Sequence, residues 1–130
     1  MYKAVSNGIR VTVVPRYLEE ESHPQEGRYF FAYTVEITNL ATDHVRLLRR
    51  YWHITDGLGR VHEVRGDGVV GEQPELGPGE SFSYTSGCPL ETTDGTMQGH
   101  YEMQRADGAL FMAEIPAFSL DMPQARRSLH

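Results

Sequence analysis

The chain has 130 residues, of which 39% are hydrophobic, 10% aromatic and 23% charged. This length is typical of one domain that folds without a metal or disulfides, and Cys88, as the single cysteine, cannot form an internal disulfide. Twelve basic and eighteen acidic residues give a formal net charge of −6, which argues against general binding to nucleic acids or membrane surfaces. No secretion signal or membrane-spanning run is recognisable, so the sequence predicts a cytoplasmic protein.

Hydrophobic and polar residues alternate along most of the chain, which is the period of a β-strand rather than of a helix. The alternation predicts strands over residues 9–13, 29–39, 45–55, 61–65, 81–86, 96–104 and 110–115. Residues 118–120 either extend the last strand or form another, and Pro15 is expected to end the first. The third strand is predicted to present two faces, with Leu48, Trp52 and Ile54 on one and Leu47, Tyr51 and His53 on the other.

Seven or eight short strands without an amphipathic helix predict an all-β fold, an immunoglobulin-like or fibronectin type III-like antiparallel β-sandwich. The run Leu76-Gly77-Pro78-Gly79 resembles the corner before a late strand in such domains. Trp52 and Tyr33 are the predicted core anchors, because buried aromatic rings offer a large apolar area. We expect one domain over residues 1–130, with a core at about 9–120, a flexible connection at about 18–28 and a frayed tail at 126–130.

Residues 66–71 match the G-x-G-x-x-G pattern of dinucleotide-binding loops. That function needs a helix directly after the glycines, whereas two prolines and two more glycines follow within residues 72–79, which prevents a helix. Gly66, Gly68 and Gly71 are therefore predicted to shape a loop through backbone angles closed to other residues. One alternative stays open, in which the loop amides, helped by Arg60 or Arg65, bind a phosphate or pyrophosphate.

The histidines offer a weak metal-binding candidate. If Gly57 and Leu58 are the two central residues of a hairpin turn, His53 and His62 lie opposite each other, and paired imidazoles bind transition metals. A shift of register by one residue removes the pairing, and the spacing matches no zinc signature. The sequence therefore predicts no metal site and no cofactor.

Catalytic signatures are missing from the sequence. Cys88 has no evident activating base, His100 being the nearest candidate along the chain. No G-x-S-x-G, P-loop or H-E-x-x-H motif occurs. These observations predict a protein that is not an enzyme.

A local basic stripe lies within the third predicted strand, next to two aromatic residues: Arg46, Arg49, Arg50, Tyr51 and Trp52. Such a stripe suits a nucleic acid or an acidic partner. The negative net charge favours another interpretation, in which the arginines pair with carboxylates such as Glu63.

Several linked blocks, spread from residue 9 to about residue 120, together resemble the ApaG family. They are Phe31-Ala32-Tyr33-Thr34-Val35, Arg50-Tyr51-Trp52, Glu63-Val64, the 66–71 glycine motif with Gln73-Pro74, Pro78-Gly79-Glu80, Tyr84-Thr85-Ser86-Gly87 and Gly95-Thr96-Met97-Gln98-Gly99-His100-Tyr101-Glu102-Met103. The resemblance is weaker over residues 18–28 and at both ends.

The resemblance implies the same immunoglobulin-like or fibronectin type III-like sandwich. In bacteria it implies a small free-standing protein, encoded beside a diadenosine tetraphosphate hydrolase and an rRNA dimethyltransferase and linked to cobalt resistance and magnesium efflux. Similar domains in eukaryotic F-box proteins and in a DNA polymerase δ-interacting protein look like protein-binding modules. No catalytic residue comes with the resemblance.

We therefore expect a non-enzymatic binding module whose partner is another protein, contacted by the 66–71 loop, neighbouring loops or an exposed sheet edge. Two alternatives stay open: binding of phosphate, pyrophosphate or a diadenosine polyphosphate at the glycine loop, and a role in cobalt or magnesium homeostasis. Neither general nucleic-acid binding nor a membrane partner is expected.

Overall fold

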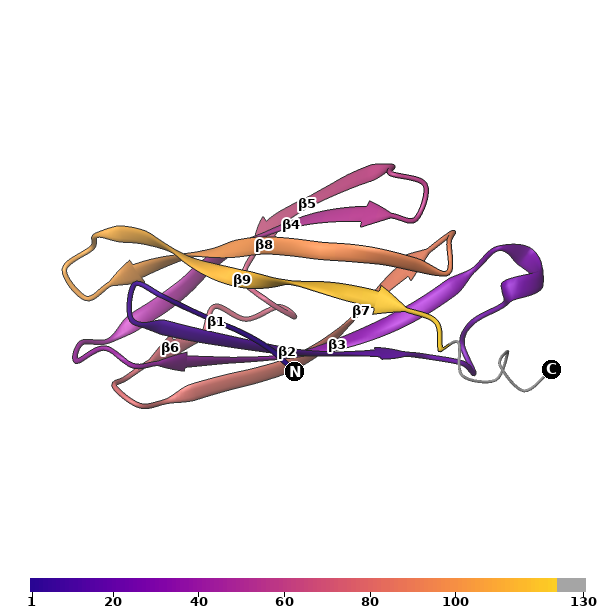
Figure 1. Ribbon diagram of the computed structural model, residues 1–130. Helices are drawn as coiled ribbons and strands as arrows, with labels where there is room; N and C mark the ends of the chain where they lie inside the picture. Colours follow the sequence, from indigo (N-terminus) through magenta and orange to yellow (C-terminus); the bar gives the residue numbers. More distant parts are fainter. Residues whose placement is uncertain (124–130) are drawn as a thin grey trace.

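A computed structural model describes residues 1–123 (Figure 1). Within this range the chain forms nine strands and one short 3-10 turn at Pro24–Glu26. The strands are β1 (Tyr2–Ser6), β2 (Ile9–Tyr17), β3 (Tyr29–Asn39), β4 (Val45–Asp56), β5 (Val61–Asp67), β6 (Glu75–Leu76), β7 (Ser81–Leu90), β8 (Asp94–Arg105) and β9 (Leu110–Asp121). No helix within residues 1–123 is long and apolar enough to span a membrane. The tail predicted at 126–130 lies outside the described residues.

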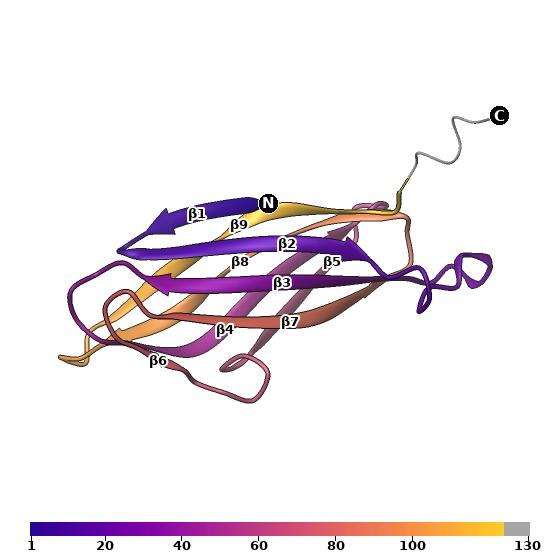
Figure 2. The same cartoon turned by 90° about the horizontal axis from the view of Figure 1, so that it is seen from below.

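The strands form two antiparallel sheets that lie face to face (Figures 1 and 2). One sheet has the order β1-β2-β3-β7 and the other β5-β4-β8-β9, with β6 also paired to β4. Alternating sequences suit this arrangement, because each strand packs one face on the core and turns the other to solvent. The predicted antiparallel β-sandwich is confirmed, and β1 and β6 are strands that the sequence did not reveal.

Inward-facing side chains of both sheets meet in one apolar core. Trp52 (2% exposed) and Tyr33 (5% exposed) belong to it, and their ring centroids lie 5.1 Å apart in an edge-on contact. Phe118 of β9 packs edge-on against Trp52 at 5.9 Å. Aromatic pairs of this geometry contribute about 0.5–1.5 kcal/mol beyond the area that they bury, so these rings tie the two sheets together.

Three strands continue through a proline: β2 through Pro15, β7 through Pro89 and β9 through Pro116. β2 runs on to Tyr17, so the prediction that it stops at Pro15 is wrong. β1 begins at Tyr2, opposite Val13, so beyond Val13 β2 is an edge strand, where proline is tolerated. β9 is likewise continuous through Pro116, which lies at an irregularity of the β8–β9 register.

A β-bulge divides β4 into two segments. Leu48 is an extra residue between Leu47 and Arg49, both of which are paired with β8. The bulge turns Leu47, Arg50 and Trp52 to the same inward face, and Leu47 is fully buried. The sequence-based assignment of Leu47 to the face opposite Trp52 is therefore wrong, because strict alternation assumes that no residue is inserted.

The connection over residues 18–28, which the sequence suggests to be flexible, folds back on itself. His23 and Arg28 form an antiparallel bridge with backbone hydrogen bonds of 2.8 and 3.1 Å. The hydroxyl of Ser22, which is 7% exposed, donates to Leu18 O at 2.7 Å and accepts from the Phe30 N–H at 2.9 Å. One buried polar side chain thus links the connection to the start of β3.

The two sides of the sandwich differ in how they are closed. On one side, residues of β1 and the turn after it bond to the backbone of β9: Asn7 Nδ2 donates to Met112 O (2.8 Å), the Glu114 N–H to Ser6 Oγ (2.8 Å) and the Ser119 N–H to Tyr2 Oη (3.3 Å). On the other side, β7 and β5 are the sheet edges (Figure 2). This second side holds a hollow of about 660 Å³.

Candidate functional site

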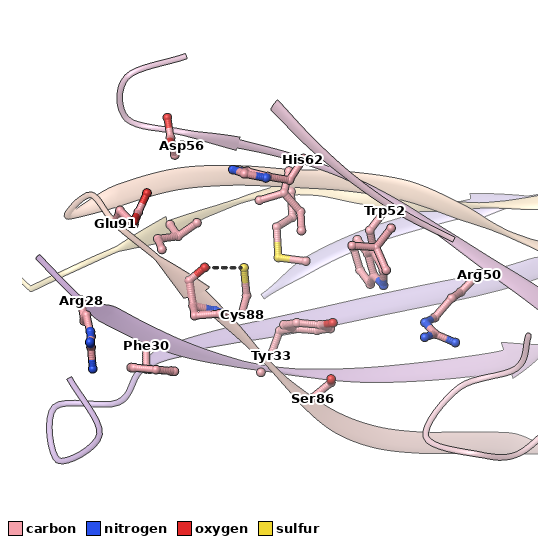
Figure 3. Close-up of a pocket in the computed structure, with 16 residues that line it drawn as sticks. Arg28, Phe30, Tyr33, Arg50, Trp52, Asp56, His62, Ser86, Cys88 and Glu91 are labelled. Atoms are coloured by element: carbon pink, nitrogen blue, oxygen red, sulfur yellow. Dashed lines mark hydrogen bonds between the residues drawn. The ribbon is translucent and has the colours of Figure 1, made fainter. Parts of the chain in front are cut away.

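A groove of about 660 Å³ opens between the sheet edges formed by β7 and β5 (Figure 3). Its apolar lining includes Tyr33, Trp52, Ile54, Val64 and Met97. Its ends carry charge, with Arg50 at one end and Arg28, Asp56 and Glu91 at the other. The remaining lining residues are Phe30, His62, Ser86, Gly87, Cys88, Pro89 and Leu90. Hollows of this size, mostly apolar with a few charged groups, are typical ligand sites.

The backbone of β7 forms one wall of the groove. Five consecutive residues, 86–90, line it, although the side chains of a strand point alternately to two faces. Cys88 and Leu90 are buried, whereas Gly87 and Pro89 are exposed and reach the groove through the edge of the strand. Among residues 1–123, β7 pairs with β3 alone, so its second edge has no strand partner.

The two edges that border the groove differ in their side chains. The exposed positions of β7 carry no charge: Ser81, Ser83, Thr85, Gly87 and Pro89. By contrast, β5 presents charged or titratable side chains: His62, Glu63, Arg65 and Asp67. Charges along an edge discourage pairing with a further strand, so β7 is the less protected edge.

The glycine loop, residues 66–71, lies at the Arg50 end of the groove. The backbones of Val69 and Glu72 bond to each other at 2.8 and 2.9 Å around a tight turn at Val70 and Gly71. Both turn residues have positive φ angles, 43° and 81°, as a type I′ turn requires. Val69 is only 1% exposed and anchors the loop in the core. Within the described chain β6, and not a helix, follows the loop.

The peptide groups of the glycine loop face a cation. Arg50 Nη1 donates to Asp67 O and Gly68 O, both at 3.0 Å. The N–H groups of Gly68, Val69 and Glu72 donate to backbone carbonyls at 2.8–2.9 Å. The loop therefore turns carbonyl oxygens towards an arginine, while these three amides are already bonded.

Gly66 and Gly68 serve different purposes. Gly66 is the cross-strand partner of Arg50, and a β carbon on it would lie 2.8 Å from both Nη1 and Nη2 of that arginine. Gly68 has a φ of +62°, and its β carbon would lie 2.2 Å from Glu72 O. Gly66 thus makes room for the guanidinium, and Gly68 allows the loop to close.

Arg50 has no carboxylate partner among residues 1–123, although six other arginines have one within 3.8 Å: Arg28, Arg46, Arg49, Arg60, Arg65 and Arg105. The Arg50 side chain is half-buried. It shares a hollow of about 190 Å³ with Tyr33, Tyr84, Ser86 and the loop residues 69–71. Figure 3 shows the Tyr33 hydroxyl pointing towards the Arg50 end, with Ser86 beside it.

The two arginines predicted to help the loop amides make contacts with other groups. Arg60 bonds to Asp56 at 2.7 Å at the opposite end of the groove. Arg65 lies over the ring of Tyr51 at 4.6 Å and beside Glu63 at 3.7 Å, on the outer face of the sheet. The glycine loop therefore meets Arg50, which the sequence had placed only in the basic stripe.

The basic stripe does not form a single patch. Arg46 pairs with Glu75 at 3.5 Å, and Arg49 pairs with Glu102. Arg50 turns inward after the Leu48 bulge. Alternation from Trp52 already places Arg50 on the inward face of β4, but its contact with the glycine loop depends on the pairing of β4 with β5, which the sequence does not reveal.

The β4–β5 turn separates the two candidate metal-binding histidines. It is a three-residue loop with Gly59 at a φ of +82°, rather than the two-residue loop that the pairing required. The additional residue sets His53 opposite Glu63 and His62 opposite Ile54. The conditional pairing of the imidazoles is therefore wrong, since they point to opposite faces. Residues 1–123 contain no group of three or more side chains suited to hold a metal.

Asp56 holds this turn through its carboxylate. The oxygens accept hydrogen bonds from the N–H groups of Leu58 (2.9 Å) and Arg60 (3.0 Å) and from Arg60 Nε (2.7 Å). Burial acts to raise the pKa of Asp56, but the hydrogen bonds from the backbone of Arg60 and Leu58, together with the Arg60 side chain, outweigh it and lower the pKa. The ionised carboxylate therefore stabilises one end of the groove.

Cys88 lies in the wall of the groove and is 4% exposed. Burial raises the pKa of its thiol to about 11, which leaves little thiolate at neutral pH. His100, the candidate base, stacks on Tyr51 at 5.0 Å on the outer face of the other sheet. The imidazole of His100 therefore does not lie near the Cys88 thiol.

The fold and the groove define a small β-sandwich protein with one side closed and one side open. A sequence profile of the ApaG domain matches residues 19–105. The chain is 66% identical over 130 residues to Protein ApaG of Methylobacterium sp. (strain 4-46), and 58% identical to Protein ApaG of Brucella anthropi, each match covering all of both chains. This chain belongs to the ApaG family.

A solved structure supports the same assignment. The crystal structure of a protein from Bordetella pertussis described as ApaA is 49% identical to this chain and superposes with a TM-score of 0.87. The superposition covers 95% of this chain and 99% of that one. The family resemblance read from the sequence blocks is confirmed.

Proposed function

We propose that this protein is a non-enzymatic binding module that takes an extended segment of a partner protein into the groove, along the free edge of β7. The unequal closure of the sandwich supports this most. Side chains of Tyr2, Ser6 and Asn7 bond to the backbone of β9, whereas the edge of β7 is unpaired and borders an apolar groove. A cytoplasmic location is part of the proposal, supported by the free thiol of Cys88.

Strand addition gives such a segment its affinity. The backbone of the segment bonds to the free edge of residues 86–90, and every second side chain then points into the groove. Pro89 has no N–H, so it limits the paired stretch. Each aliphatic side chain buried against exposed apolar lining residues such as Val64 and Pro89 contributes about 1.5–3 kcal/mol, part of which offsets the lost motion of the segment. We therefore expect a segment with apolar residues at alternate positions.

The other functions that the sequence left open have less support. The amides of Gly68 and Val69 are bonded within the protein, and Arg60 and Arg65 are paired with Asp56 and Glu63, which weakens phosphate or diadenosine polyphosphate binding at these amides. A cobalt or magnesium role loses the paired imidazoles on which a site would have been built.

A selection of random peptides on the immobilised protein tests the proposal, followed by titration of the synthesised peptides into ¹⁵N-labelled protein. Val64→Asp places a charge in the groove. Val61→Asp is the matched control, because Val61 lies on the same strand, is 51% exposed and does not line the groove.

We expect the selected peptides to shift the amides of residues 84–88 and 90, and Val64→Asp to weaken binding about 10-fold or more through the buried charge. Val61→Asp should change the affinity less than about twofold. Peptides that shift only the outer faces of the sheets, or equal losses in the two variants, would contradict the proposal.

A further inference from the structure

We propose that Arg50 anchors the C-terminal carboxylate of the bound segment, so that the partner is recognised by its last residues. This inference rests on the proposed function of the groove and names the chemistry of its occupant. It depends on three features of the described chain: the charge state around Arg50, the polar groups beside it and the direction of β7.

The guanidinium of Arg50 is a cation without a counterion inside residues 1–123. Nη1 bonds to two carbonyl oxygens of the glycine loop, and no hydrogen bond to this part of the chain is seen for Nη2 or Nε. The loop carbonyls hold the guanidinium in place without neutralising it. A half-buried cation in an apolar groove is stabilised by an anion, and a carboxylate matches the fork of an arginine.

Hydroxyl groups line the hollow beside Arg50. Tyr33 and Ser86 are cross-strand partners, and both line the hollow of about 190 Å³ that Arg50 shares with the glycine loop. Hydroxyl donors and a guanidinium together satisfy the two oxygens of one carboxylate, which accept several hydrogen bonds. The hollow is thus suited to one small anionic group at the end of an apolar groove.

The position of the glycine loop favours a chain end over an internal acidic side chain. Residues 69–71 face Tyr84 and Ser86 of β7 across the hollow, so a segment that follows β7 from its Leu90 end meets the loop beside Arg50. An antiparallel segment runs in that direction and arrives at Arg50 with its C-terminus. An internal residue would need the chain to continue through the space that the loop occupies.

Gly66 is a positioning residue in this arrangement. Because a β carbon there would lie 2.8 Å from both terminal nitrogens of Arg50, Gly66→Ala displaces the guanidinium while it keeps the charge. The matched pair for the charge itself is Arg50→Gln and Arg49→Gln, since the side chain of Arg49 lies on the outer face and pairs with Glu102.

The experiment uses random heptapeptides displayed with free C-termini and selected on the intact protein. Each selected peptide is then synthesised as the free acid, as the C-terminal amide and with three additional residues at its C-terminus. Calorimetry gives the affinity of each form for the wild-type protein, Arg50→Gln, Gly66→Ala and Arg49→Gln, and thermal unfolding checks that each variant is folded.

We expect amidation and C-terminal extension each to weaken binding about 10- to 100-fold, as loss of a charge-assisted pair does. Arg50→Gln should bind the free acid and the C-terminal amide equally weakly. Gly66→Ala should reduce the difference in affinity between the acid and the amide, whereas Arg49→Gln should leave that difference unchanged. If Arg50→Gln does not fold, Gly66→Ala tests the same point, because it displaces the guanidinium that distinguishes the acid from the amide.

The possible negative results distinguish an error about Arg50 from an error about the groove. Peptides that shift residues 84–90 but bind equally well as acid and amide would overturn the role of Arg50 and leave the groove as a peptide site. Equal affinity of the extended peptides would point to an internal acidic residue and contradict the proposal. Pyrophosphate that binds at Arg50 more tightly than any free-acid peptide would also contradict it.

Discussion

Tyr84 of β7 and Tyr101 of β8 share a hydrogen bond of 2.5 Å that crosses the core and joins the two sheets beside the groove. Tyr101 is fully buried, whereas Tyr84 is 8% exposed and also lines the hollow next to Arg50. The two tyrosines are therefore not equivalent, because only Tyr84 borders a hollow.

Removing either hydroxyl tests this difference. We expect Tyr84→Phe to cost about 2–3 kcal/mol of unfolding free energy, since it leaves the Tyr101 hydroxyl buried without a partner. Tyr101→Phe should cost about 1 kcal/mol, because Tyr84 borders the hollow next to Arg50, from which a water molecule could replace the lost partner. Urea unfolding measures both, and the double Phe variant serves as the control, with a loss smaller than that of Tyr84→Phe. A larger loss of unfolding free energy in Tyr101→Phe than in Tyr84→Phe would contradict this difference between the two hydroxyls.

The glycine loop contains a matched pair of glycines for a stability test. Gly68 and Gly71 both have positive φ angles, but a β carbon meets Glu72 O at 2.2 Å in the first case and nothing within 4 Å in the second. We expect Gly71→Ala to cost about 1 kcal/mol from backbone strain alone, and Gly68→Ala to cost at least about twice as much because the loop must also open. Equal losses in thermal unfolding would show that the contact is relieved without cost.

Asp56 should make stability depend on pH in the acid range. Its pKa is lower in the folded than in the unfolded chain, so its ionised form favours folding above the unfolded value of about 4. This contribution is lost as the pH falls from there through the folded pKa. We expect the difference in unfolding free energy between the wild type and Asp56→Asn to shrink between pH 6 and pH 3. A difference that stays constant with pH would rule out this role for the carboxylate.

Cys88 reports on the groove. Because burial raises the pKa of its thiol to about 11, we expect it to react with an alkylating reagent at pH 8 on the order of 100-fold more slowly than in the urea-unfolded protein. A selected peptide at saturating concentration should slow the reaction further, since Cys88 lines the groove. Fast labelling of the folded protein, with no effect of the peptide, is the outcome that this arrangement does not allow.

The period of the hydrophobic residues was sufficient to predict the sandwich, because each strand buries one face. It was not sufficient for β1, whose inward residues Tyr2, Ala4 and Ser6 are not uniformly apolar and whose Val5 is 56% exposed. The alternation of hydrophobic and polar residues also does not reveal where a single residue is inserted into a strand or a turn. One extra residue at Leu48 reverses the faces of β4, and one extra loop residue shifts the register of β5.

The candidate site was less predictable than the fold for the same physical reason. The groove lies between two sheet edges, and its lining comes from β3, β4, β5, β7 and β8, segments far apart in the sequence. The glycine motif did indicate an unusual backbone, but its purpose depends on Arg50, which faces Gly66 through the pairing of β4 with β5. Pairing of strands that are distant in sequence decides such a contact, and the residues near the motif do not reveal it.

Hydrogen–deuterium exchange along β7 tests the central claim most directly. In the free protein, we expect the amides of residues 84–88 that point away from β3 to exchange rapidly, because that edge has no partner among residues 1–123. A saturating selected peptide should slow exchange of these amides at least about 10-fold, while the amides of β9 stay unchanged. Protection that appears on another edge, or edge amides that are already slow in the free protein, would contradict strand addition at β7.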